Sequence, residues 1–304
     1  STTGYNHSAY LRLMVKICGF TFIRNAVKYD FPVVEAIQSI LPLCDQVFVA
    51  VGQSEDATRE LIANISPKIV IIDTIWEDQL RSGGTVLAQE TNKAFNAIPL
   101  SYDWCIYIQG DEVIHEKYLP IIKDHINLNH PQKNVDGLVL HYLHFYGNFQ
   151  YIADASRWYR REVRIIRNDK SIFSYRDAQG FRKKEDEKLR VKIIPAWVYH
   201  YGYVKHPATM KAKVNNSNRY WHSDDWLNKN AISEELFDYN NIDSLTLFKD
   251  SHPAVMLDRI KAKDWDFQFD IQTKKRNLKE KIKYTIEKWT GWRIGEYKNY
   301  TVIR

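Results

Sequence analysis

Two adjacent carboxylates follow one of the most apolar segments of the chain. Residues 104–108 read WCIYI, which is typical of a buried β-strand, and the sequence then turns polar at Gln109, Gly110, Asp111 and Glu112. A buried carboxylate is unfavourable unless it binds a cation or accepts hydrogen bonds. Asp111 could therefore bind a divalent cation, and Glu112 could either support such a site or fix the turn. The alternative is a polar turn that caps the next helix.

A histidine later in the chain could complete such a cation site. His200 follows an apolar stretch and offers a nitrogen ligand, although a lone histidine beside aromatic residues is more often a hydrogen-bonded core residue. His141 and His144 also look like a ligand pair. They lie three residues apart on an expected strand and therefore point to opposite faces, so we reject them as a joint site.

The first half of the chain alternates between strand and helix patterns. This order indicates an α/β fold with a mostly parallel central sheet flanked by helices. Ligands of such sheets bind beyond the carboxyl ends of the strands, and residues 52–56 and 109–112 both lie at such ends. The expected strands are 15–23, 46–51, 68–75 and 104–108, and the expected helices are 32–41, 54–65 and 86–98.

The second half of the chain is less regular. Strand patterns occur at 136–147, 161–168 and 188–204, the last with a bend, and helices are expected from Pro207 onward. The composition, 44% hydrophobic and 26% charged, is that of an ordinary globular protein.

Positive charge is concentrated at the end of the chain. The 304 residues carry 43 Lys and Arg and 37 Asp and Glu, but residues 271–304 contribute ten and three of these, a net charge of +7. A nucleic-acid-binding protein is expected to carry its basic patch on the folded domain, so we exclude that class. The tail also places Leu278, Ile282, Ile286 and Trp289 on one stripe of a basic amphipathic helix.

Cysteine usage and hydropathy indicate a cytoplasmic protein. Cys18, Cys44 and Cys105 lie in or beside apolar runs and show neither paired nor metal-binding spacing, which favours buried thiols in a reducing compartment. No apolar run reaches the length of a membrane span, and the start of the sequence shows no signal peptide.

Four motifs occur in order along this alternating background. They are FIRNA at 22–26, VGQSEDATRELI at 51–62, DWCIYIQGDEVI at 103–114 and VYHYGYVKHPATMKAK at 198–213. Together they resemble, in turn, the opening Asn motif, the Gly-Ser-x-Asp-x-Thr turn, the Asp-x-Asp motif and the later His segment of family 2 glycosyltransferases, which have the GT-A fold. The resemblance covers residues 14–125 well and continues more loosely to about 213. It implies a catalytic domain over 1–270, with a nucleotide-binding half at about 14–125 and an acceptor half at about 126–270, followed by the tail 271–304.

Two positions depart from the pattern of that family. Gln109 stands where the family has the first Asp of Asp-x-Asp, which bears on the metal dependence. Val51 and Gly52 stand where the family has an Asp pair that contacts a uracil base, which leaves the base of the donor undetermined.

The resemblance implies roles for most of the candidate residues. Asp111 and His200 are expected to hold Mg²⁺ or Mn²⁺ against the diphosphate of a nucleotide-sugar donor, with Gln109 on the ribose. The further residues expected at the donor are Asn25 in the opening motif, Gly52 and Asp56 at the nucleotide turn, Arg81 and Asn92 near the sugar or phosphate, and Lys205 beside the diphosphate. Asp56 could instead serve only as a helix cap.

An inverting transfer also needs a carboxylate that takes the proton of the acceptor hydroxyl. Asp177, in a Gly-containing loop, is the favoured candidate. Asp186 is similar to the Glu-Asp pair of the family but lies within a run of charges; if neither serves, the acceptor site lies near Asp154 or Glu162. Residues 144–161 mix aromatic rings with Arg, which suits either an acceptor groove or an aromatic core edge.

The sequence therefore predicts a glycosyltransferase of polysaccharide biosynthesis that moves a sugar to a glycan or lipid-linked acceptor. One alternative is a sugar-phosphate nucleotidyltransferase, which is disfavoured because CGFTFIRNA at 18–26 supplies a single Gly before the strand end. Another is a non-catalytic carbohydrate-binding relative. For the tail, one hypothesis is docking on the domain, and the sharper one is peripheral contact of residues 274–292 with the anionic inner face of a membrane.

Overall fold

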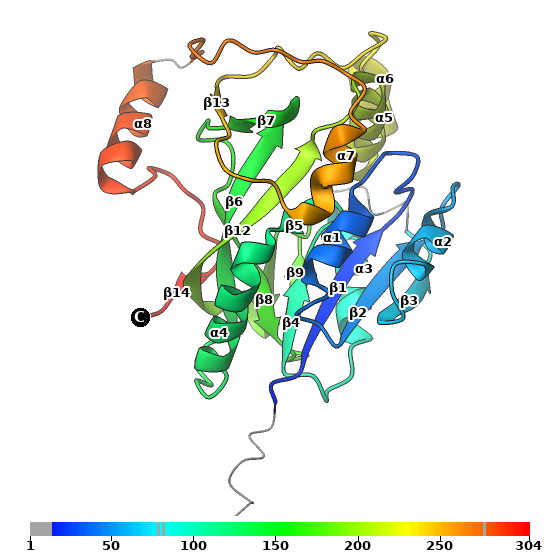
Figure 1. Ribbon diagram of the computed structural model, residues 1–304, viewed down its shortest axis with the longest axis vertical. Coiled ribbons are helices and arrows are strands. Elements are labelled where there is room, and N and C mark those ends of the chain that lie inside the picture. The colour runs from blue at the N-terminus through cyan, green and yellow to red at the C-terminus, as the bar shows by residue number, and fades with distance from the viewer. Residues whose placement is uncertain (1–13, 78–79, 81–82, 276–277) are drawn as a thin grey trace, which may run out of the picture.

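Parallel strands form the half of the sheet that carries the first candidate residues. The computed structural model describes residues 14–77, 80, 83–275 and 278–304. Four strands run parallel in the order β3, β2, β1, β4 (Figure 1). They are β1 (Ile17–Ile23), β2 (Gln46–Gly52), β3 (Ile69–Thr74) and β4 (Trp104–Tyr107), with helices α1 (Val33–Ile40), α2 (Thr58–Ala63) and α3 (Thr85–Asn96) between them in sequence. The expected α/β fold, a central sheet flanked by helices, is confirmed.

Alternate residues of these strands feed two apolar layers. In β2, Val47 and Val49 belong to the layer that includes residues of α1 and α4 (Leu119–Asn129), whereas Phe48 and Ala50 belong to the layer that includes residues of α3. Successive side chains of a strand point to opposite faces, so a strand buried on both faces reads as an unbroken apolar run. Cys18, Cys44 and Cys105 lie in these layers as buried free thiols, as predicted.

Antiparallel strands extend the sheet into the second half of the chain. Beyond β4 the order is β8, β6, β7 and β13, and β12 pairs with β6, β5 and β14. The strands are β5 (Glu112–Ile114), β6 (Gly137–Tyr146), β7 (Asn148–Ala153), β8 (Arg161–Arg167), β12 (Arg190–Tyr203), β13 (Leu245–Leu247) and β14 (Thr301–Val302), and a separate three-stranded sheet holds β9 (Ile172–Tyr175), β10 (Gly180–Lys183) and β11 (Glu187–Lys188). The bend expected within 188–204 is a register shift in β12 between Ile193 and Trp197, on either side of Pro195.

Helices follow β12 as expected from Pro207. The remaining helices are α5 (Pro207–Ser217), α6 (Asp224–Asn230), α7 (Leu257–Lys261) and α8 (Leu278–Thr290), and the 3₁₀ turns are η2 (Glu116–Tyr118), η3 (Lys184–Asp186), η4 (Asn218–Tyr220) and η5 (Ala254–Met256). Pro207 occupies the first turn of α5, where its missing N–H costs no hydrogen bond. Within the parts of the chain that the structure describes, no helix combines the length and apolar character that a membrane span requires.

The C-terminal tail returns to the sheet. Thr301 of β14 pairs with Arg190 of β12, and Asn299 is buried. Helix α8 stands to one side of the sheet (Figure 1), and its Glu287 pairs with Arg160, the residue before β8, and with Arg293 of the tail itself. The tail therefore docks on the domain through its charged side and its last strand.

Candidate active site

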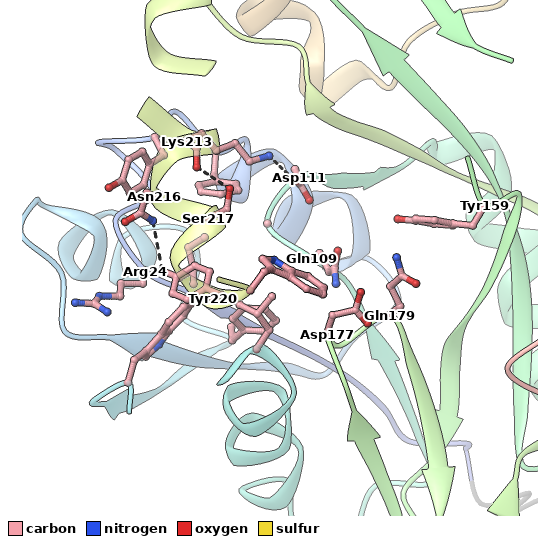
Figure 2. Close-up of a pocket in the computed structure, with 18 residues that line it drawn as sticks. Arg24, Gln109, Asp111, Tyr159, Asp177, Gln179, Lys213, Asn216, Ser217 and Tyr220 are labelled. Atoms are coloured by element: carbon pink, nitrogen blue, oxygen red, sulfur yellow. Dashed lines mark hydrogen bonds and ion pairs between the residues drawn. The ribbon is translucent and has the colours of Figure 1, made fainter. Parts of the chain in front are cut away.

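A pocket of about 260 Å³ lies at the carboxyl ends of β1 and β4. Figure 2 shows Asp111 and Lys213 in the upper part of this pocket, with Asp177 and Gln179 below them. Residues at the ends of parallel strands converge on one edge of the sheet, as the fold rule predicts. Aromatic rings make up much of the remaining wall: Phe22, Tyr29, Phe31, Trp76, Tyr159, Tyr220 and Trp221.

Asp111 binds a lysine that the sequence reasoning did not select. Its Oδ2 lies 3.0 Å from Lys213 Nζ, and its Oδ1 lies 3.7 Å from His200 Nε2. Burial acts to raise the pKa of Asp111, but the positive charge and hydrogen bond of Lys213 hold that pKa below its usual range. Asp111 is therefore an anion that orients Lys213 toward the pocket. The close approach also requires Gly202, because a Cβ there would lie 2.8 Å from Asp111 Oδ2.

Glu112, the second carboxylate of the strand end, has a structural role. It is fully buried and forms two hydrogen bonds with Arg164, of 2.9 and 2.8 Å. It also accepts hydrogen bonds from Tyr142 Oη at 2.7 Å and from the backbone N–H of Gln109 at 3.1 Å. Of the two roles considered for Glu112, fixing the turn is therefore the one that the structure shows.

His200 lies beside Asp111 because of the register of the sheet. β5 pairs antiparallel with β12 so that His200 is opposite Glu112, one residue from Asp111. Its Nδ1 lies 3.1 Å from His144 Nδ1, and burial lowers the pKa of both imidazoles, that of His144 to about 3. His141 instead stacks on Trp197, which agrees with the rejection of the 141 and 144 pair.

The donor set of this site fits a divalent cation poorly. Asp111 and His200 are two suitable ligands, but Glu112 is bound to Arg164, and an ammonium already lies against Asp111. Among the described residues, no group of three or more His, Cys, Asp or Glu side chains is placed to hold a metal ion. Mg²⁺ and Mn²⁺ prefer several oxygen ligands, which this pair of residues does not supply. The use of Mg²⁺ or Mn²⁺ stays a prediction.

Lys205 lies behind the pocket rather than in its wall. It is fully buried, its Nζ donates to the backbone carbonyl of Asp30, and it lies 4.8 Å from the centre of the Phe31 ring. Burial, together with the charge of Lys213, lowers the pKa of Lys205 to about 7. Of the two lysines, Lys213 is the one that lines the pocket.

Two residues predicted to contact the nucleotide, Asn25 and Asp56, link the loops that follow β1 and β2. Asn25 has a φ of 53° and accepts a hydrogen bond of 2.8 Å from the N–H of Glu55. Asp56 accepts hydrogen bonds from the N–H of Lys28 at 2.7 Å and of Thr58 at 3.0 Å. Both side chains thus join the loop after β1 to the loop after β2, and Asp56 contacts the first residue of α2, whose N-cap residue is Ala57.

The other residues predicted to contact the nucleotide-sugar donor lie in different parts of the structure. Gly52 packs directly against the indole of Trp76, which leaves no space for a Cβ. Asn92 exchanges hydrogen bonds of 2.9 and 2.7 Å with the backbone of Ser174 in β9 and does not line the pocket. Gln109 lines the pocket and donates to Tyr107 Oη at 3.3 Å. Arg81 lies outside the described residues.

The structure separates the two candidate bases. Asp177 lines the pocket, and burial raises the pKa of its carboxyl against backbone hydrogen bonds that act to lower it. Asp186 has a side chain that is 77% exposed, 3.2 Å from Arg182, and does not reach the pocket. Of the two candidate bases, Asp177 is the one that lies in the pocket, and its role as a base stays a prediction.

Lys213 could have been found from the helical spacing of its motif. In α5, Met210 is buried, and residues three and four apart lie on the same face of a helix. Lys213 is three residues after Met210 and shares its inward face. Lys211 is a single residue away and does not line the pocket.

No protein-family model and no curated protein matches the chain. Among solved structures, S. aureus TarS is similar at 15% identity over 66% of this chain, with a TM-score of 0.38, and this chain covers 39% of it. S. aureus TarS 1-349 in complex with UDP-GlcNAc is 16% identical, with coverages of 72% and 68% and a TM-score of 0.38. The glucosyl-3-phosphoglycerate synthase of Mycobacterium tuberculosis, in complex with Mn²⁺ and UDP-glucose, is 13% identical, with coverages of 43% and 44% and a TM-score of 0.30. At these identities and TM-scores, the likeness assigns neither an activity nor a ligand to this chain.

Proposed function

We propose that this chain is a glycosyltransferase that moves a sugar from a nucleotide-sugar donor to a glycan or lipid-linked acceptor. The observation that carries the proposal is the meeting of Lys213, Gln109 and Asp177 in one pocket at the carboxyl ends of parallel strands. A leaving diphosphate needs a cation, the hydroxyls of a ribose or sugar need hydrogen-bonding groups, and an acceptor hydroxyl needs a base. The aromatic wall offers flat faces for a base or a sugar ring.

The proposed reaction is a single displacement that inverts the anomeric carbon. The acceptor oxygen forms a bond to that carbon while the bond from the carbon to the diphosphate breaks. The acceptor proton passes to Asp177, and the electron pair of the broken bond leaves with the diphosphate. Lys213, held by Asp111 at 3.0 Å, stabilises the negative charge that develops on the leaving group.

Replacement of Lys213 tests this role. We expect Lys213→Met to weaken the binding of nucleoside diphosphates by about one to two orders of magnitude, because it removes a charge-assisted contact from a partly buried site. Calorimetry with a panel of nucleoside diphosphates, nucleotide sugars and nucleoside triphosphates, with and without Mn²⁺, measures the effect. Lys211→Met is the matched control on the same helix, and its affinities should equal those of the wild type.

The same panel separates the alternatives. Binding of diphosphate sugars that depends on Lys213 supports the glycosyltransferase. Binding of triphosphates alone would support the sugar-phosphate nucleotidyltransferase, and binding of no nucleotide would support the non-catalytic relative. A wild-type affinity in Lys213→Met would contradict the role of that lysine.

We also propose that α8 holds the enzyme on an anionic membrane that carries the acceptor. Three of its apolar side chains are largely exposed: Leu278, Ile282 and Trp289 are 76%, 53% and 84% exposed. Glu287 on the other side of the helix is bound to Arg160, so the helix is attached by its charged side and turns its apolar stripe outward. The helix also carries lysines at 279, 281, 283 and 288. This combination of apolar and basic groups complements an anionic lipid surface.

Vesicle binding tests the membrane proposal. We expect the full chain to sediment with phosphatidylserine vesicles at low salt and to dissociate at high salt. Leu278→Asp should lower the partition coefficient by about tenfold, since it removes one apolar side chain from the contact. Leu100→Asp is the control, because Leu100 is also 76% exposed but lies elsewhere. Equal partitioning of the two variants, or no sedimentation of the wild type at low salt, would overturn the proposal.

A further inference from the structure

A second cavity, of about 320 Å³, lies beside the donor pocket and shares Tyr159 and Gln179 with it. The segment that leads into β8, Lys283 of α8 and the segment that follows α8 form most of its wall. A neighbouring hollow of about 520 Å³ contains Asp177 and Gln179 and shares residues with both spaces. The three form one continuous surface, so an acceptor that presents a hydroxyl to Asp177 would extend into the second cavity.

Five cationic side chains face the second cavity, and three of them have carboxylate partners. Arg160 binds Glu296 with Nε 2.6 Å from Oε1, and Arg293 binds Glu287 with Nη2 2.8 Å from Oε1. These pairs neutralise one another and brace the segment after α8. The five are Arg157, Arg160, Arg161, Lys283 and Arg293.

The two remaining cations are Arg161 and Lys283. Neither side chain forms a hydrogen bond or an ion pair with any residue in the described parts of the chain, and Arg161 Nε is buried. A buried donor without an acceptor is unfavourable. An anion in the cavity would supply the missing acceptor for Arg161 and a counter-charge for both residues.

Glu162 does not cancel this positive charge. Its Oε2 is buried in the same wall and has no hydrogen-bond partner, and burial raises the pKa of its carboxyl to about 8. The carboxyl is therefore protonated at neutral pH and offers an O–H donor to an anion. The cavity thus holds two unpaired cations and one neutral acid beside the pairs that are already balanced.

We propose that Arg161 and Lys283 bind a phosphate group of the acceptor, an inference that rests on the proposed function. A guanidinium presents a planar fork that matches two oxygens of a phosphate, and a nearby ammonium adds a second charge. The acceptor is then a phosphate-bearing molecule whose hydroxyl reaches Asp177 while its phosphate lies in the second cavity. The C-terminal segment is a wall of the acceptor site, since it supplies Lys283.

Inorganic phosphate is the first probe. Calorimetry on the full chain should give a dissociation constant that rises about tenfold or more in Arg161→Met, because a charge-assisted contact is lost. Lys184→Met removes the same charge from an exposed site outside the cavity and should bind phosphate like the wild type. Lys213→Met tests whether phosphate binds in the donor pocket instead. Unfolding curves check that the variants are folded.

The outcomes separate this inference from the proposed function. If Arg161→Met binds phosphate like the wild type, or if only Lys213→Met weakens binding, the inference is overturned. If nucleotides do not bind but the phosphate affinity depends on Arg161, the anion site stands and its assignment to a sugar acceptor fails. Glycerol phosphate and vesicles that contain phosphatidic acid then identify the source of the phosphate. If the binding of glycerol phosphate depends on Arg161, the ligand is a soluble phosphate. If only the binding of the vesicles depends on Arg161, the ligand is a lipid phosphate.

Discussion

Asp177→Asn is expected to lower the rate of sugar transfer by about two to four orders of magnitude while the affinity for the donor stays the same. Asp177 is the carboxylate that lines both the donor pocket and the adjoining hollow, so it lies where a donor and an acceptor would meet. An amide of the same shape cannot accept the proton of the acceptor hydroxyl. The release of nucleoside diphosphate from the bound nucleotide sugar, in the presence of acceptor, measures the rate.

The pH dependence of the rate distinguishes a base from a structural residue. Burial raises the pKa of Asp177 above its ordinary value, and a base is active only when it is deprotonated. The wild-type rate should therefore fall as the pH drops through this raised pKa, and Asp177→Asn should lack that limb of the profile. Asp186→Asn changes an exposed side chain and should leave the rate of sugar transfer nearly unchanged. Normal turnover of Asp177→Asn, or a large loss in Asp186→Asn, would contradict the assignment.

Local patterns in the sequence were sufficient to predict the parallel half of the sheet and the strand ends at which the pocket lies. The apolar runs at β1, β2 and β4 are buried on both faces, β3 is a partly exposed edge strand, and the alternation with helices leaves parallel strands as the simple solution. The carboxyl ends of parallel strands lie at one edge, so Gln109 and Asp111 could be placed together in advance. Their roles in binding and catalysis stay predictions.

Partners that are distant in sequence could not be predicted. Glu112 and Arg164 are separated by 52 residues and meet only because β8 pairs antiparallel with β4. His200 reaches Asp111 through the register between β5 and β12. Only the family resemblance had placed Asp111 and His200 together. Local sequence patterns indicate which residues are buried, but they carry no information on which buried cation faces which carboxylate. For the same reason, the sequence pointed to Lys205 beside the diphosphate, whereas Lys213 is the lysine that lines the pocket.

Arg164→Met should destabilise the fold by about 3–5 kcal/mol, because it leaves the carboxylate of Glu112 buried without its counter-charge. Both side chains of this pair are at most 1% exposed. Denaturant unfolding measures the loss. Arg59→Met is the control: its pair with Asp73 is more than half exposed, and such surface pairs contribute about 0–1 kcal/mol. If Arg164→Met and Arg59→Met lost the same stability, the uncompensated charge of Glu112 would not be the cause of the destabilisation.

A second change separates the buried charge from the lost packing. In the double variant of Glu112→Gln with Arg164→Met, the amide carries no charge and can still accept the hydrogen bond of 2.7 Å from Tyr142. Part of the stability should therefore return, whereas a double variant as unstable as Arg164→Met alone would assign the whole loss to packing.

The conservative variant Arg164→Lys connects this stability effect to the site. Arg164 Nη1 also donates to the backbone carbonyl of Gln179 at 2.9 Å, two residues after Asp177, while Glu112 holds the backbone of Gln109. The ion pair thus fixes two neighbouring segments of the pocket wall, which also meet where Gln109 Nε2 donates to the carbonyl of Ala178 at 3.3 Å. A lysine keeps the charge but cannot bind the two Glu112 oxygens and this carbonyl together. We therefore expect Arg164→Lys to be more stable than Arg164→Met and yet to lose transfer activity, since the loop that carries Asp177 is no longer held. Full activity in a stably folded Arg164→Lys would show that the position of this loop does not depend on Arg164.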